Sequence, residues 1–185
     1  RRLRYNAKIR DFIRETKLSA SDLVAPLFIR HGQNVRNPIK SMPGHFQLSV
    51  DQLPAELDAL YELGLRNILL FGIPAEKDAL GSDSYAENGI IQRAIAAIKA
   101  SPHDFLIISD VCFCEYTDHG HCGVLTNGEL DNDASLENLA RASLSYAKAG
   151  VDVVAPSGML DGFVGTVRQG LDEDCFDQVG IMAYS

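Results

Sequence analysis

The sequence lacks any apolar run long enough to cross a membrane, and it has fewer basic than acidic side chains. Because a membrane span needs about 18 or more consecutive apolar residues, we expect neither a membrane anchor nor a signal peptide. Lys and Arg total 17 against 25 Asp and Glu, which gives a net charge of -8. This charge argues against nucleic acid and anionic membranes as partners, because both attract basic surfaces.

The sequence also has few cysteines, and their distribution does not suit a disulfide framework. Of the four, three lie within eleven residues and the fourth, Cys175, stands alone. Clustered thiols of this kind fit a reducing compartment, so we expect the protein to be cytoplasmic. Cys175 is expected to be half-buried and without a functional role.

One short segment, residues 110–123, contains most of the side chains that could carry chemistry. Cys112, Cys114 and Cys122 have the spacing Cys-x-Cys-x7-Cys, accompanied by two histidines and several carboxylates. Thiolates are soft ligands that select zinc over magnesium or calcium. Alternate side chains of a strand point to one face, so Cys112 and Cys114 are predicted to share a strand face and a metal.

The third thiol must then return from a loop, and Gly120 and Gly123 give that loop the freedom to fold back. Two metal-bound arrangements remain open. Three thiolates can hold Zn²⁺ and leave the fourth position to water or substrate, as in catalytic sites. Alternatively, His119 or His121 closes the tetrahedron and the metal stabilises the loop. Free buried thiols without metal are the third reading.

The apolar pattern predicts strands separated by amphipathic helices. The strands are expected at residues 24–29, 67–73, 105–111, 151–155 and 180–184. The helices are expected at 7–16, from a Ser49–Gln52 capping box to Gly64, at 89–100 with Ile91, Ile95 and Ile98 inward, from a Ser135 cap to Gly150, and at about 161–171. Residues 37–44 are expected to form a turn-rich loop, and 74–88 a long polar loop of the kind that carries function.

Strands that are apolar throughout, each followed by a helix, indicate an α/β fold with parallel strands buried on both faces. No Gly-x-Gly-x-x-Gly follows the first strand, which disfavours a dinucleotide-binding fold. The pattern could be a doubly wound sheet or part of a (β/α)8 barrel. A complete barrel needs about 250 residues, so five strands resemble an unfinished TIM barrel. In such a barrel, Asp110, Cys112 and Ser157 would lie at the strand ends where barrel enzymes keep their chemistry, which favours the open zinc site.

Residues 110–123 resemble the zinc motif of the porphobilinogen synthase (5-aminolevulinate dehydratase) family. Other resembling segments are 26–29, 38–44, 70–74, 92–95, 154–157, 159–162 and 181–185. The resemblance implies an N-terminal arm and short helix at residues 1–20 and the first half of a (β/α)8 barrel at 21–185. It also implies a homo-octamer and a lyase that condenses two 5-aminolevulinate molecules to porphobilinogen, a step of tetrapyrrole and haem synthesis.

By the same resemblance, Cys112, Cys114 and Cys122 would ligate a catalytic Zn²⁺, and Mg²⁺ is a further candidate in the full-length parent. Asp110 would line the site beside the metal, and Ser157 would contact the substrate. Zinc can polarise a carbonyl or hold an amine, and a carboxylate can assist proton transfer. The simpler structural roles are a strand-end cap for Asp110 and a turn residue for Ser157.

The chain departs from the family in its lysines. The family forms Schiff bases through two lysines on later strands, and a Schiff-base lysine must lie desolvated in the pocket. The six lysines here are expected in helices or loops: Lys8, Lys17, Lys40, Lys77, Lys99 and Lys148. We therefore expect an N-terminal portion of the enzyme that does not catalyse the condensation alone.

A half-barrel leaves sheet edges at its first and fifth strands and a bare apolar face, so association with itself or with the missing half is expected. The strongest rival function is a non-catalytic zinc-stabilised scaffold or binding module. A zinc hydrolase is a second rival, but such enzymes usually use histidine and carboxylate ligands.

Overall fold

The computed structural model describes residues 1–184, and its centre is one seven-stranded sheet. The strand order is β2-β3-β1-β4-β5-β8-β9, and β6 pairs with β7 in a separate two-stranded sheet. The bounds of the strands are β1 (Val24–Arg30), β2 (Arg36–Pro38), β3 (Phe46–Ser49), β4 (Asn67–Ile73), β5 (Leu106–Val111), β6 (Val124–Thr126), β7 (Glu129–Asp131), β8 (Val153–Pro156) and β9 (Gly180–Ile181).

Five of these strands, β1, β4, β5, β8 and β9, are parallel neighbours in the order of the chain. The predicted partial barrel is therefore confirmed as a mostly parallel α/β sheet, which does not close within residues 1–184. The last strand is shorter than the 180–184 predicted, although Met182 N and Tyr184 N still donate to Val154 O and Pro156 O. Ser185, at the end of the resembling segment, lies outside the described residues.

The helices follow the predicted order, with shifted ends. They are α1 (Ala7–Phe12), α2 (Leu53–Glu62), α3 (Ile90–Lys99), α4 (Asn132–Ala149) and α5 (Phe163–Glu173). Four 3₁₀ turns add η1 (Arg2–Arg4), η2 (Ala20–Asp22), η3 (Val50–Gln52) and η4 (Ser82–Tyr85), the last within the long polar loop.

Both predicted serine caps are wrong. The hydroxyl of Ser49 accepts from Val35 N at 2.9 Å, and so it serves a neighbouring loop and does not cap a helix. Helix α4 begins earlier than predicted, because Asp131 is its N-cap and accepts from Ala134 N at 3.1 Å. Ser135 is buried within the first turn, where its hydroxyl accepts from Val124 N.

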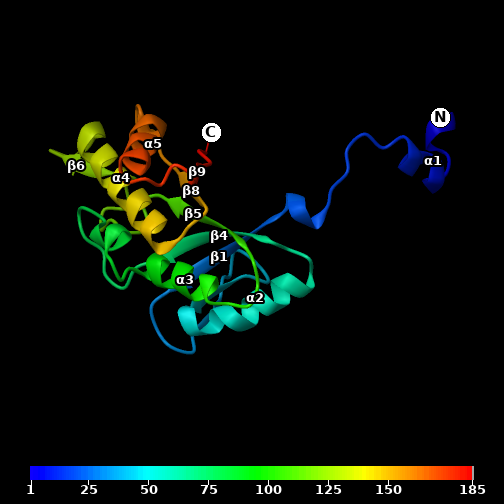
Figure 1. Cartoon of the computed structure of the whole chain (residues 1–185), viewed down its shortest axis with the longest axis horizontal. Coiled ribbons are helices and arrows are strands. Elements are labelled where there is room, and N and C mark those ends of the chain that lie inside the picture. Colours follow the sequence, from blue (N-terminus) through cyan, green and yellow to red (C-terminus); the bar gives the residue numbers. More distant parts are fainter. Residues whose placement is uncertain (185) are drawn as a thin grey trace.

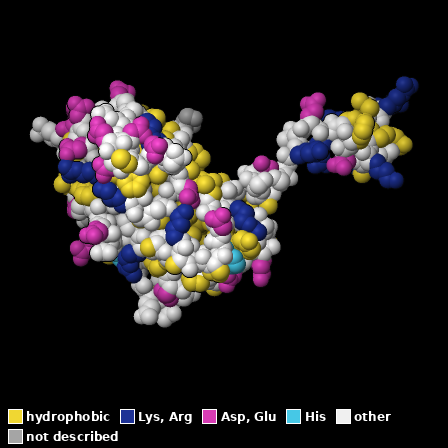
Figure 2. All heavy atoms as spheres, in the orientation of Figure 1, with side chains coloured by type: hydrophobic (Ala, Val, Ile, Leu, Met, Phe, Trp, Pro, Cys, Tyr) yellow, Lys and Arg dark blue, Asp and Glu magenta, His cyan; other side chains and the backbone are white. Residues whose placement is uncertain are grey.

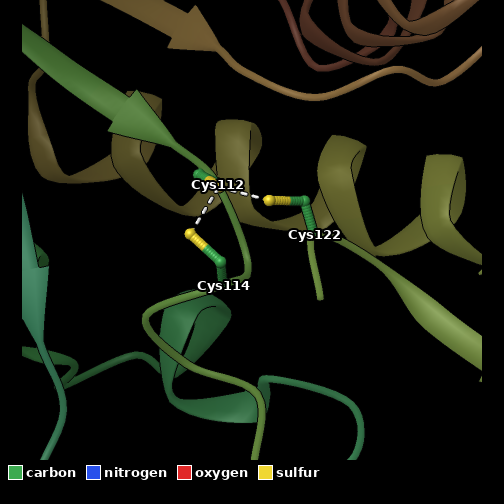
Figure 3. Close-up of side chains that lie close together, drawn as sticks. All are labelled: Cys112, Cys114 and Cys122. Carbon is green, nitrogen blue, oxygen red and sulfur yellow. Dashed lines mark hydrogen bonds between the residues drawn. The ribbon is translucent and has the colours of Figure 1, made fainter. Parts of the chain in front are cut away.

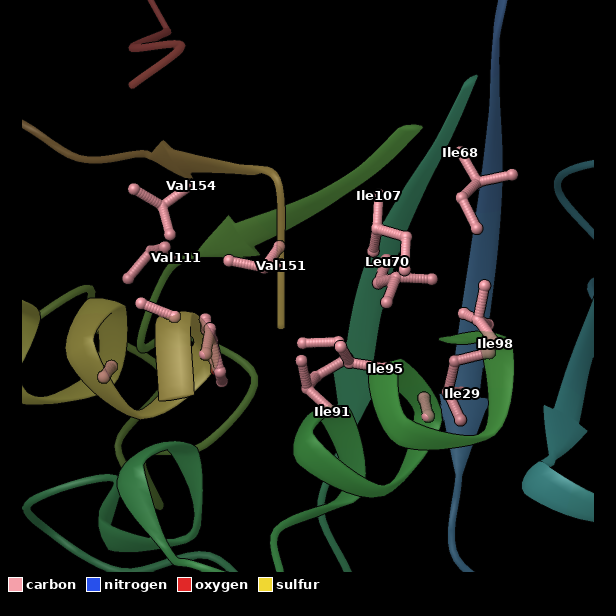
Figure 4. Packing of buried hydrophobic residues seen from close by; sticks show 14 of the residues in the cluster. Ile29, Ile68, Leu70, Ile91, Ile95, Ile98, Ile107, Val111, Val151 and Val154 are labelled. Carbon is pink, nitrogen blue, oxygen red and sulfur yellow. The ribbon is translucent and has the colours of Figure 1, made fainter. Parts of the chain in front are cut away.

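The core lies between the sheet and its helices. Ile91, Ile95 and Ile98 of α3 are fully buried, as predicted, and Figure 4 shows them facing Ile68 and Leu70 of β4. Burial alternates along β4, as expected when helices cover one face of a strand.

The expectation that strands are buried on both faces is therefore wrong for β1 and β4, although β5 and β8 carry consecutive buried residues and agree with it. On the face away from α3, Phe28 and Phe71 stack with ring centroids 5.1 Å apart, and both are half-buried. This agrees with the bare apolar face predicted for a half-barrel.

The predicted open edge at β1 is partly covered. β3 pairs in parallel with the end of β1 over Phe28–Arg30, and β2 pairs antiparallel with β3. These two strands lie in and after the segment predicted to be a turn-rich loop. β2 has three residues and β3 has four, so their apolar patterns are too short to predict strands from the sequence.

The N-terminal segment projects from the body of the molecule (Figure 1), and none of the residues in η1 and α1 is buried. Its apolar side chains are exposed (Figure 2), with Tyr5 at 75% and Phe12 at 91%. No helix within residues 1–184 combines the length and apolar character needed to cross a membrane.

Candidate metal centre

The cysteine loop starts at the carboxyl end of β5, one residue after Val111. The prediction that Cys112 and Cys114 share a strand face is wrong, because the chain turns immediately after the strand. Thr117 N and Tyr116 N both donate to Phe113 O at 2.8 Å, which closes that turn.

The turn nevertheless brings the three predicted thiols together. The sulfur of Cys112 lies 3.1 Å from that of Cys114 and 3.0 Å from that of Cys122. Figure 3 shows the sulfurs of Cys114 and Cys122 both pointing toward Cys112. All three sulfurs lie within 4.8 Å of one another, and Cys112 is buried while the other two are half-buried. Three converging thiols are a donor set that suits a soft divalent metal ion.

The return of the chain to Cys122 depends on glycine, as predicted. Gly120 has a left-handed backbone with φ of 75°. Gly123 is required because the chain passes close to Ser135 at this point, and a Cβ on residue 123 would collide with the Ser135 hydroxyl. The hydroxyl of Thr117 donates to His121 O at 2.8 Å and ties the two sides of the loop together.

A second loop, between β4 and α3, supports the cysteine loop. Asp78 N donates to Tyr116 O at 3.3 Å, and Asp118 N donates to Asp78 O at 3.1 Å. Tyr116 is buried, and its hydroxyl contacts the position of a Cβ on Gly72 in β4. The length of the β4–α3 loop suggested a function, but nothing in the sequence indicated this pairing.

Burial, the largest cause, raises the pKa of the Cys112 thiol, and its hydrogen bond with Cys122 raises it further. Burial and the neighbouring Glu115 likewise raise the pKa of Cys114 to about 12, against a lowering by Cys112. Cys112 and Cys114 are therefore protonated at neutral pH in the metal-free chain, and a metal ion must displace their protons to bind.

Asp110 and Ser157 lie on neighbouring strand ends, as predicted. Asp110 is in β5, where it pairs with Ala155 of β8. Burial and the negative charge of Glu115 raise the pKa of Asp110 to about 7, while a hydrogen bond with Tyr184 lowers it. Ser157 follows β8, and its N–H donates to Val111 O at 3.1 Å. This bond holds Ser157 beside Val111, the residue that precedes Cys112.

The two histidines of the loop lie apart from the sulfur cluster. Nδ1 of His119 accepts from His121 N at 3.1 Å, and Nε2 of His119 lies 3.3 Å from Ala79 O. Within residues 1–184, neither group of prospective metal ligands includes an imidazole. His119 is thus engaged in hydrogen bonds within its own loop and with the β4–α3 loop, and not with the sulfurs.

Glu115 is the neighbour that the sequence reasoning did not single out. The thiol of Cys114 donates to its Oε2 at 3.1 Å. A ligand oxygen of Glu115 also groups with Asp110 and Cys112 within 4.8 Å. The position of Glu115 next to Cys114 in the sequence could have identified it as a neighbour of the thiols. Cys175 is exposed, contrary to the half-buried position expected for it.

Comparisons with known proteins agree with this fold. The sequence model of the family described as "ALAD: Delta-aminolevulinic acid dehydratase" matches residues 1–185. The chain is 52% identical over 185 residues to the delta-aminolevulinic acid dehydratase of Halalkalibacterium halodurans, and 48% identical to that of Methanothermus sociabilis. It covers 56% and 58% of these proteins, so it spans little more than half of their length.

A solved structure gives the same result for the fold. The chain superposes on delta-aminolevulinic acid dehydratase (porphobilinogen synthase) from Toxoplasma gondii ME49, in complex with the reaction product porphobilinogen, with a TM-score of 0.95. The identity is 34%, and the match covers 100% of this chain and 53% of the other.

Proposed function

The chain belongs to the delta-aminolevulinic acid dehydratase family, and from this we propose that it forms the metal-binding half of a porphobilinogen synthase. The whole enzyme would be a lyase that condenses two 5-aminolevulinate molecules to porphobilinogen. The observation that carries the proposal is the convergence of three thiols at the carboxyl end of β5. In barrel enzymes this is the end of the strands where catalysis occurs.

Cys112, Cys114 and Cys122 would hold the metal, and zinc is the ion that their thiolates favour. When bound, such an ion supplies Lewis acidity toward a carbonyl or amine of the substrate. The rest of the cysteine loop would keep the three sulfurs in place, because Thr117 joins its two sides.

Asp110 would pair with an amine of the substrate and transfer a proton at its carboxylate oxygens. This role is supported by the position of Asp110 in β5, two residues before Cys112, at the strand end that carries the thiols. Ser157 would orient the substrate by hydrogen bonding through its hydroxyl. It follows the neighbouring strand β8 and is bonded through its backbone to Val111.

The Schiff bases of the family require lysines inside the pocket. Lys99 pairs with Asp152 at 2.9 Å and Lys148 with Asp174 at 3.1 Å, on the helical side of the sheet. We therefore infer that residues corresponding to the rest of the relatives' length would complete the site. The 185-residue chain alone would then have no turnover.

We further infer that the protein acts in the cytoplasm as part of a homo-oligomer, an octamer in the complete enzyme, with Mg²⁺ as a candidate second ion. The support for assembly is the projecting arm, whose Leu3, Tyr5 and Phe12 side chains are exposed. Exposed apolar side chains gathered on one segment are typical of interaction surfaces.

Two measurements test the proposal. Zinc content after dialysis is expected to be one ion per chain. Porphobilinogen formation from 5-aminolevulinate is expected to be absent with the chain alone. It is expected to appear when the chain is fused to the remaining segment of the Halalkalibacterium enzyme. A fusion that folds and binds zinc but makes no porphobilinogen would contradict the proposed activity.

A further inference from the structure

A cavity of about 560 Å³ lies between α3, α4 and the loop that joins β4 to α3, and the cysteine loop does not line it. Its volume falls in the range of cavities that bind small molecules. Its lining combines two cations, Arg141 and Lys148, with one anion, Glu87, and an apolar wall. We propose that this cavity binds a small molecule that carries two carboxylates and one amine.

The two cations fit the two carboxylates. Arg141 and Lys148 are seven residues apart in α4, which is close to two helical turns. They therefore lie on one face of the helix, about 10 Å apart along its axis. Leu144 and Ser145 stand between them in the sequence, are half-buried and line the same cavity. A molecule with acidic groups at its ends and an apolar centre matches this order of charge and apolar surface.

Both cations have partners that a bound molecule can replace. Arg141 pairs with Glu137, and Lys148 pairs with Asp174. These four side chains are 42–65% exposed. Ion pairs this exposed contribute little to stability, because water and salt screen them. The two cations can thus exchange these partners for the carboxylates of a ligand at little cost.

Glu87 is the reason for the amine. Within residues 1–184, it is the only acidic side chain that lines the cavity, and it lies on the wall opposite α4, in the loop before α3. Glu87 repels a molecule that has carboxylates alone, and it attracts an ammonium group. Tyr85, on the same wall, supplies an aromatic surface for the apolar centre of the ligand.

Gln92 connects the cavity to the loop that supports the metal centre. Its buried amide Nε2 donates to Ser84 O at 2.9 Å and to Ser145 Oγ at 2.8 Å, and so joins the β4–α3 loop to α4. Asp78 of the same loop bonds to Tyr116 of the cysteine loop. A molecule that bridges the loop and α4 holds both in place, so its binding is expected to favour zinc binding as well.

The experiment measures the binding of three probes to the metal-free 185-residue chain by isothermal titration calorimetry. The probes are porphobilinogen, which has two carboxylates and an aminomethyl group on a planar ring, glutamate, and glutarate, which is glutamate without its amine. Arg141→Gln and Lys148→Gln each remove one cation, and Glu87→Gln removes the anion. Lys99→Gln is the matched control, because Lys99 also forms an exposed ion pair, with Asp152, but does not line the cavity.

Each cation variant is expected to bind porphobilinogen or glutamate about 3- to 5-fold more weakly than the parent, and Lys99→Gln to match the parent. Glu87→Gln is expected to weaken the two amines and to strengthen glutarate. Tighter binding of porphobilinogen than of glutamate supports the product of the proposed reaction as the ligand, and the reverse order supports an amino acid. No binding of any probe at millimolar concentration, or equal effects of Lys148→Gln and Lys99→Gln, would overturn the inference.

Zinc affinity is measured by competition with a chromophoric chelator, with and without the tighter probe. It is expected to rise about 5-fold when the cavity is saturated, and probe affinity is expected to rise by the same factor when zinc is bound, because coupling is reciprocal. Lys148→Gln corrects for zinc that the probe itself binds. An unchanged zinc affinity would contradict the connection through Gln92. A chain that binds the probe but no zinc would contradict the proposed function and leave this site intact.

Discussion

The hydroxyl of Tyr116 lies where a side chain on Gly72 would begin, so the cysteine loop rests directly on β4. A Cβ on Gly72 would also lie 2.8 Å from Cγ1 of Ile91, a fully buried residue of α3. Because neither neighbour can move without disturbing the core or the loop, Gly72 couples the packing of the sheet to the position of the cysteine loop.

Gly72→Ala is therefore expected to destabilise the chain by about 1–3 kcal/mol, the range for overpacking in a core. It is also expected to weaken zinc binding, because Tyr116 must shift. Urea unfolding and chelator competition measure the two effects. Gly165→Ala in α5 is the control, since a Cβ there meets nothing within 4 Å, and it is expected to leave both quantities intact or raise stability slightly.

The double variant Gly72→Ala, Tyr116→Phe tests whether the two residues interact. Removing the phenol oxygen relieves the closest contact, so the two changes are expected to be non-additive by about 0.5 kcal/mol or more. Additive effects on both unfolding and zinc affinity would show that the contact with Tyr116 is not the cause.

Each of Cys112→Ser, Cys114→Ser and Cys122→Ser is expected to abolish tight zinc binding, because each removes one of three converging thiols. Cys175→Ser is the matched control, as this thiol is exposed and far from the cluster in sequence. With the parent chain, free zinc at about 100 times the dissociation constant is expected to add about 2.7 kcal/mol to the free energy of unfolding. Chelation by EDTA is expected to remove that increment in the parent and to have no effect on the serine variants.

The arm and the body are expected to respond differently to truncation of apolar side chains. Ile95→Ala is expected to cost about 2–5 kcal/mol, since Ile95 is fully buried against the sheet. Leu18→Ala is expected to change stability by less than about 0.5 kcal/mol, because Leu18 is 75% exposed. Equal losses in urea unfolding would mean that the arm folds against the body.

The stability of the chain is expected to fall in acid partly through Asp51. Hydrogen bonds from Gln52, Ser49 and Asn34 N lower its pKa from 3.8 to about 2. A carboxyl whose pKa is lower in the folded state stabilises it above pH 3.8, and this contribution is lost as the pH falls toward 2. The urea midpoints of the parent and Asp51→Asn are thus expected to differ at pH 5 and to converge below pH 3. A constant difference over that range would contradict the assignment.

The sequence predicted the long elements well because their apolar pattern reflects burial. The bounds of β4 were predicted residue for residue, and the buried isoleucines of α3 were identified from their spacing. The errors concern polar side chains with more than one available partner. Ser49 and Ser135 carried cap signals, but tertiary contacts with Val35 and Val124 took their hydroxyls instead.

The candidate metal centre was predictable in composition but not in backbone geometry. The spacing of Cys112, Cys114 and Cys122 was sufficient to predict that they converge. The spacing could not show that a tight turn, and not a strand, brings Cys114 to Cys112. Nor could it show that Asp78 pairs with the cysteine loop, because that contact depends on how two loops from neighbouring strands meet.

All three thiols lie within eleven consecutive residues that hang from β5. Binding of a metal ion by these thiols therefore does not require the sheet to close into a barrel. It requires the local turn and the strands that pair with β5. During synthesis on the ribosome, we therefore expect the nascent polypeptide to be able to bind a metal ion once β8 has emerged, without waiting for strands beyond β9.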